Sequence, residues 1–421
     1  QLYNTADSVM VGNYVGSNAL AAVGASSSMI YLLIAFSQGA AVGAGVIVAQ
    51  YLGARDKKSV SDAVHTSLVI AGILGIVLTI AGIVLSRQLL EWMKTPEEVM
   101  EQAVTYFRLY SAGMFFGIVY NMAAGILNAA GNSKRSLLYL AVASLTNIVL
   151  DILFIAIMDM GVAGAAIATD ISQAVSCILS VSFLMRVKDS YQVSLKKLKI
   201  HRRIAGSMIR VGLPTGIQNM VISLSNVLVQ TSVNGFGAAA MAGYTAYLKI
   251  DGFNILPVMS FSMAVTTFAG QNYGAGNYDR VKKGMYVTLA MGFVYTVLTG
   301  ALLLTFDDQI MGMFSRDAEV ITCGKLAMKY FCPFYFILSI LHGLSGALRG
   351  VGKSIPPMVV LLLSLCVFRI FWIWLVLPHF STIEGVYLLY PVSWALGAVM
   401  IIIYACTAKW LPAGRQQGKV R

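Results

Sequence analysis

Residues 136–158 read SLLYLAVASLTNIVLDILFIAIM, an apolar run of 23 residues that is long enough to cross a bilayer as one α-helix. The run contains a single carboxylate, Asp151, which lies closer to its middle than to its second end, where an ionised acid costs several kcal/mol unless it has a partner. Asn147 precedes Asp151 by four residues, so the amide and the carboxyl group share one face of the helix. The pair can bind a proton or a small cation; alternatively, Asn147 hydrogen-bonds a protonated Asp151 where two helices pack.

The composition of the whole chain is that of a membrane protein. Hydrophobic residues make up 58% of the 421 positions, charged residues make up only 11%, and the mean hydropathy is +0.76. A water-soluble domain does not reach these values. The net charge of +12 does not indicate a nucleic-acid-binding protein, because the basic residues lie in short gaps between apolar runs, where they determine topology. The five cysteines form no CxxC or metal-binding spacing, so we predict no disulfide framework.

Apolar runs separated by glycine, proline and charged residues predict twelve transmembrane helices, and the fold class is therefore all-α. The chain begins inside the first run, so we expect the start of that helix to be missing. Of the 30 lysines and arginines, 21 lie in alternate connections and in the tail, whereas the other connections hold only Arg87, Lys94 and Arg316. By the positive-inside rule, we predict a multi-pass protein of the cytoplasmic membrane with both termini in the cytoplasm.

The second half of the chain repeats the first at a constant offset of 221 residues. AQYLGARDKKSV from Ala49 matches GQNYGAGNYDRV from Gly270, and Gly164 is repeated as Gly385. A unit of six spans has therefore been duplicated, and because six is even, both copies enter the membrane in the same direction. We predict an N-terminal lobe at residues 1–187, a cytoplasmic linker at 188–205, a C-terminal lobe at 206–408 and a cytoplasmic tail at 409–421.

Four stretches make the sequence resemble the multidrug and toxic compound extrusion (MATE) family. They are YNTADSVMVGNYVG in the first span, VAQYLGA after the second, TNIVLDILF in the fifth and FAGQNYGAGNYDRV after the eighth. The likeness covers essentially the whole chain, and the GQNYGAG loop with its repeat partner AQYLGAR is its most specific part. The resemblance implies a transporter with twelve helices in two lobes.

In the DinF-like branch of that family, the N-terminal lobe carries the site for the coupling ion on its first, fifth and sixth spans. The resemblance assigns these roles to Asp7 in the first span, to the pair Asn147 and Asp151 in the fifth, and to the hydroxyl of Thr169 in the sixth. If the ion is Na⁺, the same four residues are its expected ligands. No other metal and no cofactor is expected.

The two lobes differ in their acids. The residues 221 positions after Asp7 and Asp151 are Leu228 and Trp372, so only the N-terminal lobe holds the carboxylates. Asp170 departs from the family pattern, in which an apolar residue stands next to the hydroxyl, and it could bond locally or join the site. Further candidates for contact with the cation or the substrate are Asp170, Asp251, Asn4, Met122 and Met259. For Asp251, which follows Lys249 by two residues, a local ion network is an equally good interpretation.

The sequence thus predicts a secondary active exporter rather than an enzyme, exchanging H⁺ or Na⁺ for amphipathic, cationic compounds by alternating access. The alternative is a flippase for lipid-linked sugars from the same superfamily. An intramembrane transferase is less favoured because the adjacent Asp307 and Asp308 have no second acidic motif, and the chain has no nucleotide-binding GxxxxGK[ST] loop. We expect a monomer whose partners are the lipid bilayer and small drug-like molecules, and no nucleic acid.

Overall fold

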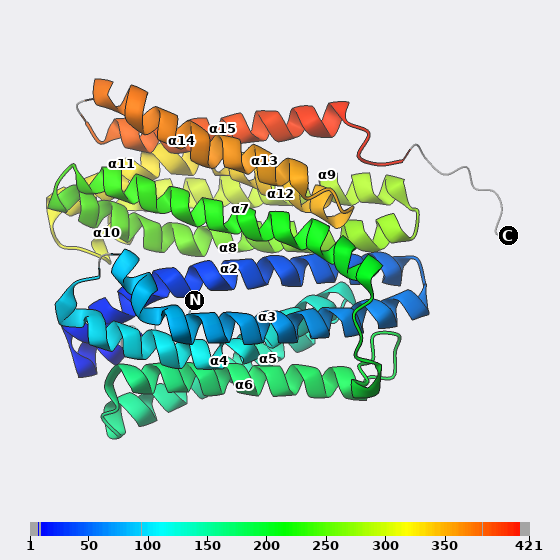
Figure 1. The fold of residues 1–421 in the computed structure, drawn as a ribbon. Helices are drawn as coiled ribbons and strands as arrows, with labels where there is room; N and C mark the ends of the chain where they lie inside the picture. The colour runs from blue at the N-terminus through cyan, green and yellow to red at the C-terminus, as the bar shows by residue number, and fades with distance from the viewer. Residues whose placement is uncertain (1–6, 8–9, 94, 381, 413–421) are drawn as a thin grey trace. The chain divides into compact units, whose positions relative to one another are not determined.

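The computed structural model describes residues 7, 10–93, 95–380 and 382–412. Over these residues the chain is helical and contains no strand, which confirms the all-α prediction. In chain order the α-helices are α2 (Ser17–Gly53), α3 (Lys57–Trp92), α4 (Glu97–Ala129), α5 (Ser133–Asp151), α6 (Gly161–Arg186), α7 (Arg202–Asn234), α8 (Ala238–Gly274), α9 (Tyr278–Thr305), α10 (Asp307–Gly312), α11 (Ala318–Phe331), α12 (Tyr335–Gly350), α13 (Ile355–Leu362), α14 (Phe368–Phe371) and α15 (Glu384–Thr407) (Figure 1).

Ten helical stretches in this part of the chain are long and apolar enough to cross a membrane. Some of them join consecutive elements, since α11 and α12 together form the stretch Ala318–Gly350. α7 is also long, but its apolar face is interrupted by polar residues such as Gln218 and Asn226. The first predicted span lies mostly outside the described residues, which include only its Asp7 and the segment from Met10 onward. With α7, the described residues supply eleven of the twelve expected helices.

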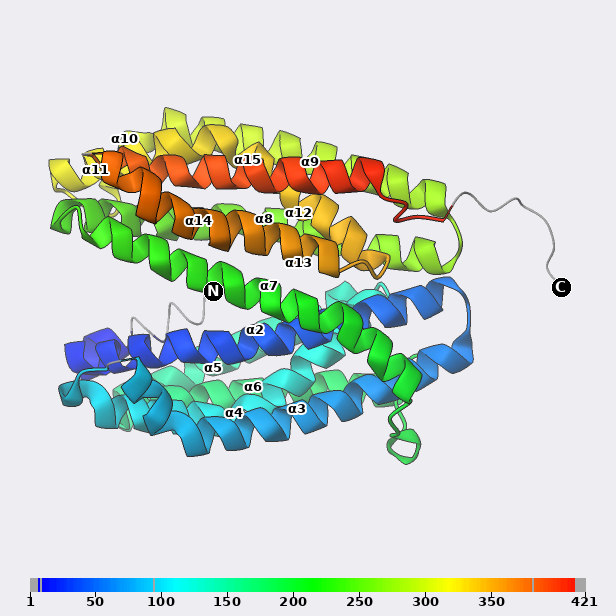
Figure 2. The same cartoon turned by 45° about the horizontal axis from the view of Figure 1, so that its top comes forward.

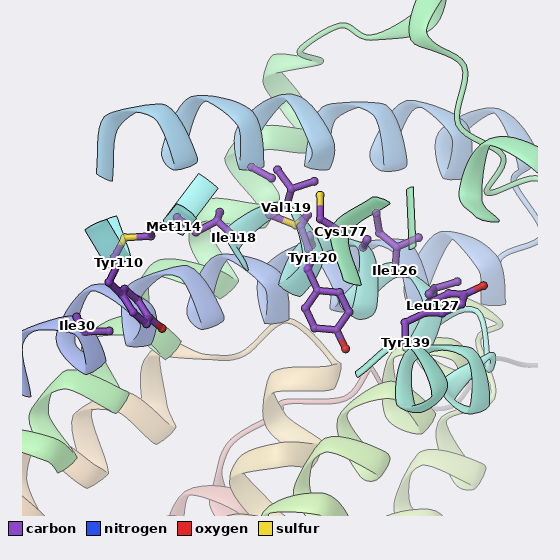
Figure 3. Close-up of a cluster of buried hydrophobic side chains, with 14 of the residues drawn as sticks. Ile30, Tyr110, Met114, Ile118, Val119, Tyr120, Ile126, Leu127, Tyr139 and Cys177 are labelled. Carbon is purple, nitrogen blue, oxygen red and sulfur yellow. The ribbon is translucent and has the colours of Figure 1, made fainter. Parts of the chain in front are cut away.

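The chain divides into two compact units, Gln1–Gly216 and Ile217–Arg421, so the boundary falls inside α7. In the N-terminal unit, α4 packs against α2, α3 and α6, and Figures 1 and 2 show these helices lying side by side. Side chains of α4 fill the core of this unit, and Figure 3 labels several of them: Tyr110, Met114, Ile118, Val119, Tyr120, Ile126 and Leu127. In the C-terminal unit, α8 packs against α9, α11 and α12, while α15 packs against α12.

The first part of α7 belongs to the N-terminal unit because glycines let it approach α2 closely. A Cβ atom added to Gly43 would lie only 2.8 Å from Cα of Gly212, which real side chains cannot do. Small residues at such crossings are the usual way in which membrane helices gain close backbone contact. The preceding connection is held to the same unit, since the Ser194 amide donates to Nε2 of the buried His65 at 2.9 Å.

The internal repeat is present in the structure as well as in the sequence. α2, α3 and α4 begin at Ser17, Lys57 and Glu97, and α8, α9 and α11 begin 221 positions later, at Ala238, Tyr278 and Ala318. Equivalent positions also touch in both units. A Cβ atom on Gly45 would contact the Gly125 carbonyl oxygen at 3.2 Å, and at the equivalent positions the Thr266 hydroxyl donates to the Gly346 carbonyl oxygen at 2.9 Å.

Candidate functional site

The four residues predicted to form one polar site come together inside the N-terminal unit. Thr169 on α6 donates its hydroxyl to Oδ2 of Asp7 in the first span, and the amide of Asn147 on α5 donates to the Thr169 hydroxyl, each at 3.4 Å. Asp151, one turn along α5, is close enough for its carboxyl group to interact with that of Asp7. The exposed fractions are 5% for Asp7, 1% for Thr169 and 0% for Asn147 and Asp151.

This site has more acceptor oxygens than donors. Four buried oxygens accept no hydrogen bond from a fixed donor among the described residues: Oδ1 of Asp7, Oδ1 of Asn147 and both carboxyl oxygens of Asp151. Asp7 and Asp151 can bond each other only when one of the two carries a proton. Unpaired buried acceptors of this kind are rare in folded proteins, because each gives up its bonds to water without replacement. The arrangement therefore suits the binding of a cation or a proton.

No basic side chain supplies the missing charge. Among the described residues of the N-terminal unit, none of the buried polar side chains is a lysine or an arginine. Two carboxylates in an apolar lobe are costly unless a cation or a proton neutralises them. Hard cations such as Na⁺ prefer carboxylate, amide and hydroxyl oxygens, which are the groups present here. Across the described part of the chain, no three His, Cys, Asp or Glu side chains form a cluster, so a transition-metal site is not indicated.

A π-helical segment comes after each of the two acids in the sequence. The π-helical segment η1 (Val11–Val15) begins one turn after Asp7, and η2 (Ile152–Ile157) begins directly after Asp151. η1 and η2 contact each other. π-helical turns weaken the regular hydrogen bonding of a helix and often occur at functional sites. Each of the two acids thus precedes a segment with irregular helical hydrogen bonding.

Sequence reasoning missed Tyr106 and Tyr110 of α4. Tyr106 is buried, and its hydroxyl interacts electrostatically with both Asp7 and Asp151. Tyr110 is one turn further along α4 and accepts a hydrogen bond at its hydroxyl from Gln173 of α6, at 3.2 Å. A tyrosine in an apolar helix is common as packing, so only the neighbouring acids identify Tyr106 as part of the site.

A cavity of about 140 Å³ lies within the same unit, between α2, α4, α5 and α6. The described residues that line it include no charged side chain, and its polar lining includes Gln38, Tyr110, Asn121, Ser144, Ser172 and Gln173. Ser172 lines the cavity and lies three residues after Thr169 on α6, so the cavity and the four-residue site share this helix. The cavity is smaller than the roughly 300–1,000 Å³ of a pocket for a drug-sized ligand.

At the equivalent positions of the C-terminal unit, the side chains are larger. The positions of Gly117 and Gln173 hold Leu338 and Trp394. Where Tyr110 and Gln173 share a hydrogen bond, Phe331 and Trp394 instead place their rings 6.1 Å apart. The same pair of positions thus makes a polar contact beside a cavity in one unit and an aromatic contact in the other.

Of the other candidate residues, Asp251 and Met259 belong to the C-terminal unit. Asp251 on α8 is partly buried and accepts hydrogen bonds from the hydroxyls of Tyr335 (2.8 Å) and Tyr247 (3.3 Å). Met122 is buried in the core and is not among the residues lining the cavity, while Met259 on α8 is half-buried. Asn4 lies outside the described residues.

Asp170 is next to Thr169 in sequence but faces a different helix. Its carboxyl group lies against Gly113 of α4, where an added Cβ atom would overlap it.

The family model MatE matches residues 1–153 and 214–375, which is most of the chain. The chain belongs to the MATE family. The curated relatives it resembles include the probable multidrug resistance protein YpnP of Bacillus subtilis, which is 29% identical over 86% of this chain and 81% of that protein. The probable multidrug resistance protein NorM of Thermotoga maritima is 26% identical over 88% and 80% of the two chains. The multidrug export protein MepA of Staphylococcus saprophyticus is 20% identical over 96% and 89%.

Solved structures have the same fold. A multidrug resistance MATE family transporter of the MOP superfamily in an outward-facing conformation matches with a TM-score of 0.90 and 25% identity, over 96% of this chain and 91% of that one. A MOP superfamily transporter from Pyrococcus furiosus, whose binding pocket is described as having reverse polarity, matches with a TM-score of 0.89 and 26% identity. This match also covers 96% of this chain and 91% of that one. This chain is therefore a multi-pass membrane protein of a multidrug transporter family, and not an enzyme.

Proposed function

We propose that this protein is a cation-coupled antiporter that exchanges H⁺ or Na⁺ for amphipathic, cationic compounds by alternating access. The observation that carries this proposal is the group of four buried oxygens without a fixed donor on Asp7, Asn147 and Asp151. Two buried acids without a buried basic partner need a positive charge to neutralise them, so such a site can bind and release a cation. A purely structural polar contact does not need a bound cation.

Ion and drug oppose each other in this scheme. When Asp7 and Asp151 are both ionised they repel each other, and they attract a cationic compound toward the adjacent cavity. A bound proton or Na⁺ relieves the repulsion and weakens the attraction, so the first span packs closer to α5 and the affinity for the compound falls. The ion then moves inward down its gradient and the compound outward, because each binds the state that the other disfavours.

The irregular segments η1 and η2 supply the flexibility that this exchange requires. Each follows one of the two acids, so a change of charge acts directly beside a helix segment with weakened hydrogen bonding. Bending at η1 would narrow the N-terminal cavity, whose wall shares α6 with Thr169.

The proposal also covers the oligomeric state, the location and the membrane topology of the protein. We infer a monomer in the cytoplasmic membrane, with both termini and residues 188–205 in the cytoplasm, because the basic residues gather in those connections. The acids of the N-terminal unit support placement in the DinF-like branch.

Transport by purified protein in proteoliposomes tests this function. With a fluorescent cationic dye on one side, an imposed pH or sodium gradient of the right direction should drive uphill dye movement, and the reversed gradient should reverse it. Dye movement that ignores both gradients, or that requires ATP, would overturn the proposal. Movement of a lipid-linked sugar in place of the dye would support the flippase alternative.

A further inference from the structure

The connection between α6 and α7 presents a row of exposed apolar and basic side chains. Its apolar members are Leu195, Leu198 and Ile200, whose exposed fractions are 63%, 41% and 39%. Its basic members, all of them exposed, are Lys196, Lys197, Lys199, Arg202 and Arg203. Residues 195–203 contain no acidic residue that could balance this charge. Together they form what we call the basic segment.

The apolar side chains share one side of the basic segment. η3 (Leu195–Lys197) is a single 3₁₀ turn, in which residues three apart lie above one another, so Leu198 follows Leu195. The backbone is extended at Leu198. Alternate residues of an extended chain point to the same side, which adds Ile200 to the pair. The segment therefore has an apolar side with basic residues around it.

Hydrogen bonds to α3 fix the position of the basic segment along that helix. Just before the segment, the Ser194 amide donates to Nε2 of His65 at 2.9 Å. Within it, the Thr66 hydroxyl donates to the Lys199 carbonyl oxygen at 3.3 Å and accepts from the His201 amide at 3.2 Å. The segment is thus held against two neighbouring residues of α3.

These two residues mark the level at which α3 enters the membrane. Residues 68–85, just beyond them, carry no charged side chain. At 1.5 Å per residue this stretch spans about 27 Å, close to the thickness of the hydrocarbon core. The basic segment therefore lies at the membrane surface. Figure 1 shows the connection at the end of the N-terminal unit where α3 begins.

The C-terminal unit shows the same helix surface without a covering segment. The positions of α9 equivalent to His65 and Thr66 hold Tyr286 and Val287, which are exposed to 64% and 50%, whereas His65 and Thr66 are buried. Exposed tyrosine and aliphatic side chains at the end of a membrane span are typical of contact with lipid. The basic segment thus lies over a surface that is open to lipid in the other unit.

We propose that the basic segment is a docking surface for anionic phospholipids. Leu195, Leu198 and Ile200 lie among the upper acyl chains, and the lysines and arginines bind the headgroup phosphates. The depth of the apolar side chains favours a bilayer over a soluble acidic protein, because headgroups and acyl chains meet at this level. The C-terminal tail and a second copy of the segment do not fit, because both are basic and would be repelled. The inference depends on neither the transported compound nor the coupling ion.

Photo-crosslinking in vesicles tests this docking surface. The unaltered protein is reconstituted in phosphatidylcholine with a minority of phosphatidylglycerol, and in separate samples an equal amount of either lipid carries a photoreactive group near its headgroup. Mass spectrometry compares the crosslink yields on residues 195–203. Each basic residue near an anionic surface strengthens binding about fivefold, so we expect at least about fivefold more crosslinks from phosphatidylglycerol. High salt should reduce this excess because it screens exposed charges.

Two lysine pairs separate the basic segment from the rest of the basic surface. Lys196→Gln with Lys197→Gln should bring the yields from the two lipids close to equal. Lys57→Gln with Lys58→Gln is the matched control and should keep the excess. That pair is also exposed, but Lys58 lies about 15 Å before residue 68 along α3, beyond the Debye length of about 8 Å. Leu195→Gln with Leu198→Gln should lower the yields from both lipids alike.

Equal yields from the two lipids in the unaltered protein, or no crosslinks on residues 195–203, would overturn the inference. The same loss of excess in both lysine pairs would also overturn it, because the net charge of the protein would then be the cause. None of these measurements requires transport. A failure of the proposed antiport therefore leaves their result unchanged, and a failure here leaves the antiport standing.

Discussion

Asp251 lies well inside α8 of the C-terminal unit, and its replacement should reveal a structural role. Asp251→Ala removes the acceptor of hydrogen bonds from Tyr335 and Tyr247, whose hydroxyl oxygens also lie 2.5 Å from each other. After this change, one tyrosine hydroxyl can still donate to the other. The second hydroxyl is buried and has no acceptor. This costs about 1–3 kcal/mol.

The measurement is reversible unfolding in mixed micelles, with Asp251→Asn as the matched control. Asparagine keeps an acceptor oxygen, so its loss of stability should be smaller than that of alanine. In proteoliposomes, both variants should keep the pH or sodium dependence of transport, because the proposed ion site lies in the N-terminal unit. Loss of all ion dependence with normal transport amplitude in Asp251→Asn would refute this reasoning and place the coupling acid in the C-terminal unit.

Three further predictions follow from the fold and the site. Gly43→Ala should lower the free energy of unfolding by about 1–3 kcal/mol through overpacking against Gly212, whereas Gly72→Ala, with open space around it, should raise it by about 0.5–1 kcal/mol; equal effects would contradict the packing. Asn147→Ala and Thr169→Ala should each raise the ion concentration needed for half-maximal transport more if the ion is Na⁺ than if it is H⁺, because each removes an oxygen ligand; no change in a sodium-driven assay would exclude them as ligands. Cysteines placed near Lys196 should react with reagents added to the cytoplasmic side, and those near Glu98 and Asp308 with reagents added outside; the opposite pattern would reverse the topology.

Much of the fold could be predicted from the sequence because a membrane permits few structures. Long apolar runs have to be helices, and a buried acid such as Asp151 stands out in them. The repeat required only a comparison of the two halves, and the starts of α8, α9 and α11 confirm its offset. The association of Asp7, Asn147, Asp151 and Thr169 followed from the family resemblance rather than from spacing alone.

Contacts between helices could not be predicted in the same way. Arg369 is an example. It donates to the hydroxyls of Ser393 and Ser225 and to the side-chain carbonyl of Asn226, with its guanidinium group 4.4 Å from the centre of the Tyr390 ring. The contact of Asp170 with Gly113 and the cavity beside Gln173 also depend on which side chains meet between helices. The residue pattern of a single helix does not predict these contacts.

The most direct test of the central claim is gradient-driven transport by Asp151→Asn in proteoliposomes. Asparagine has nearly the shape of aspartic acid but cannot release a proton or carry the negative charge, so it keeps this position neutral at all times and removes its repulsion with Asp7. We predict that the variant reaches the membrane in normal amounts and folds, yet accumulates no dye under either a pH or a sodium gradient. Uphill dye transport by well-folded Asp151→Asn, with an unchanged response to pH and sodium, would contradict the account.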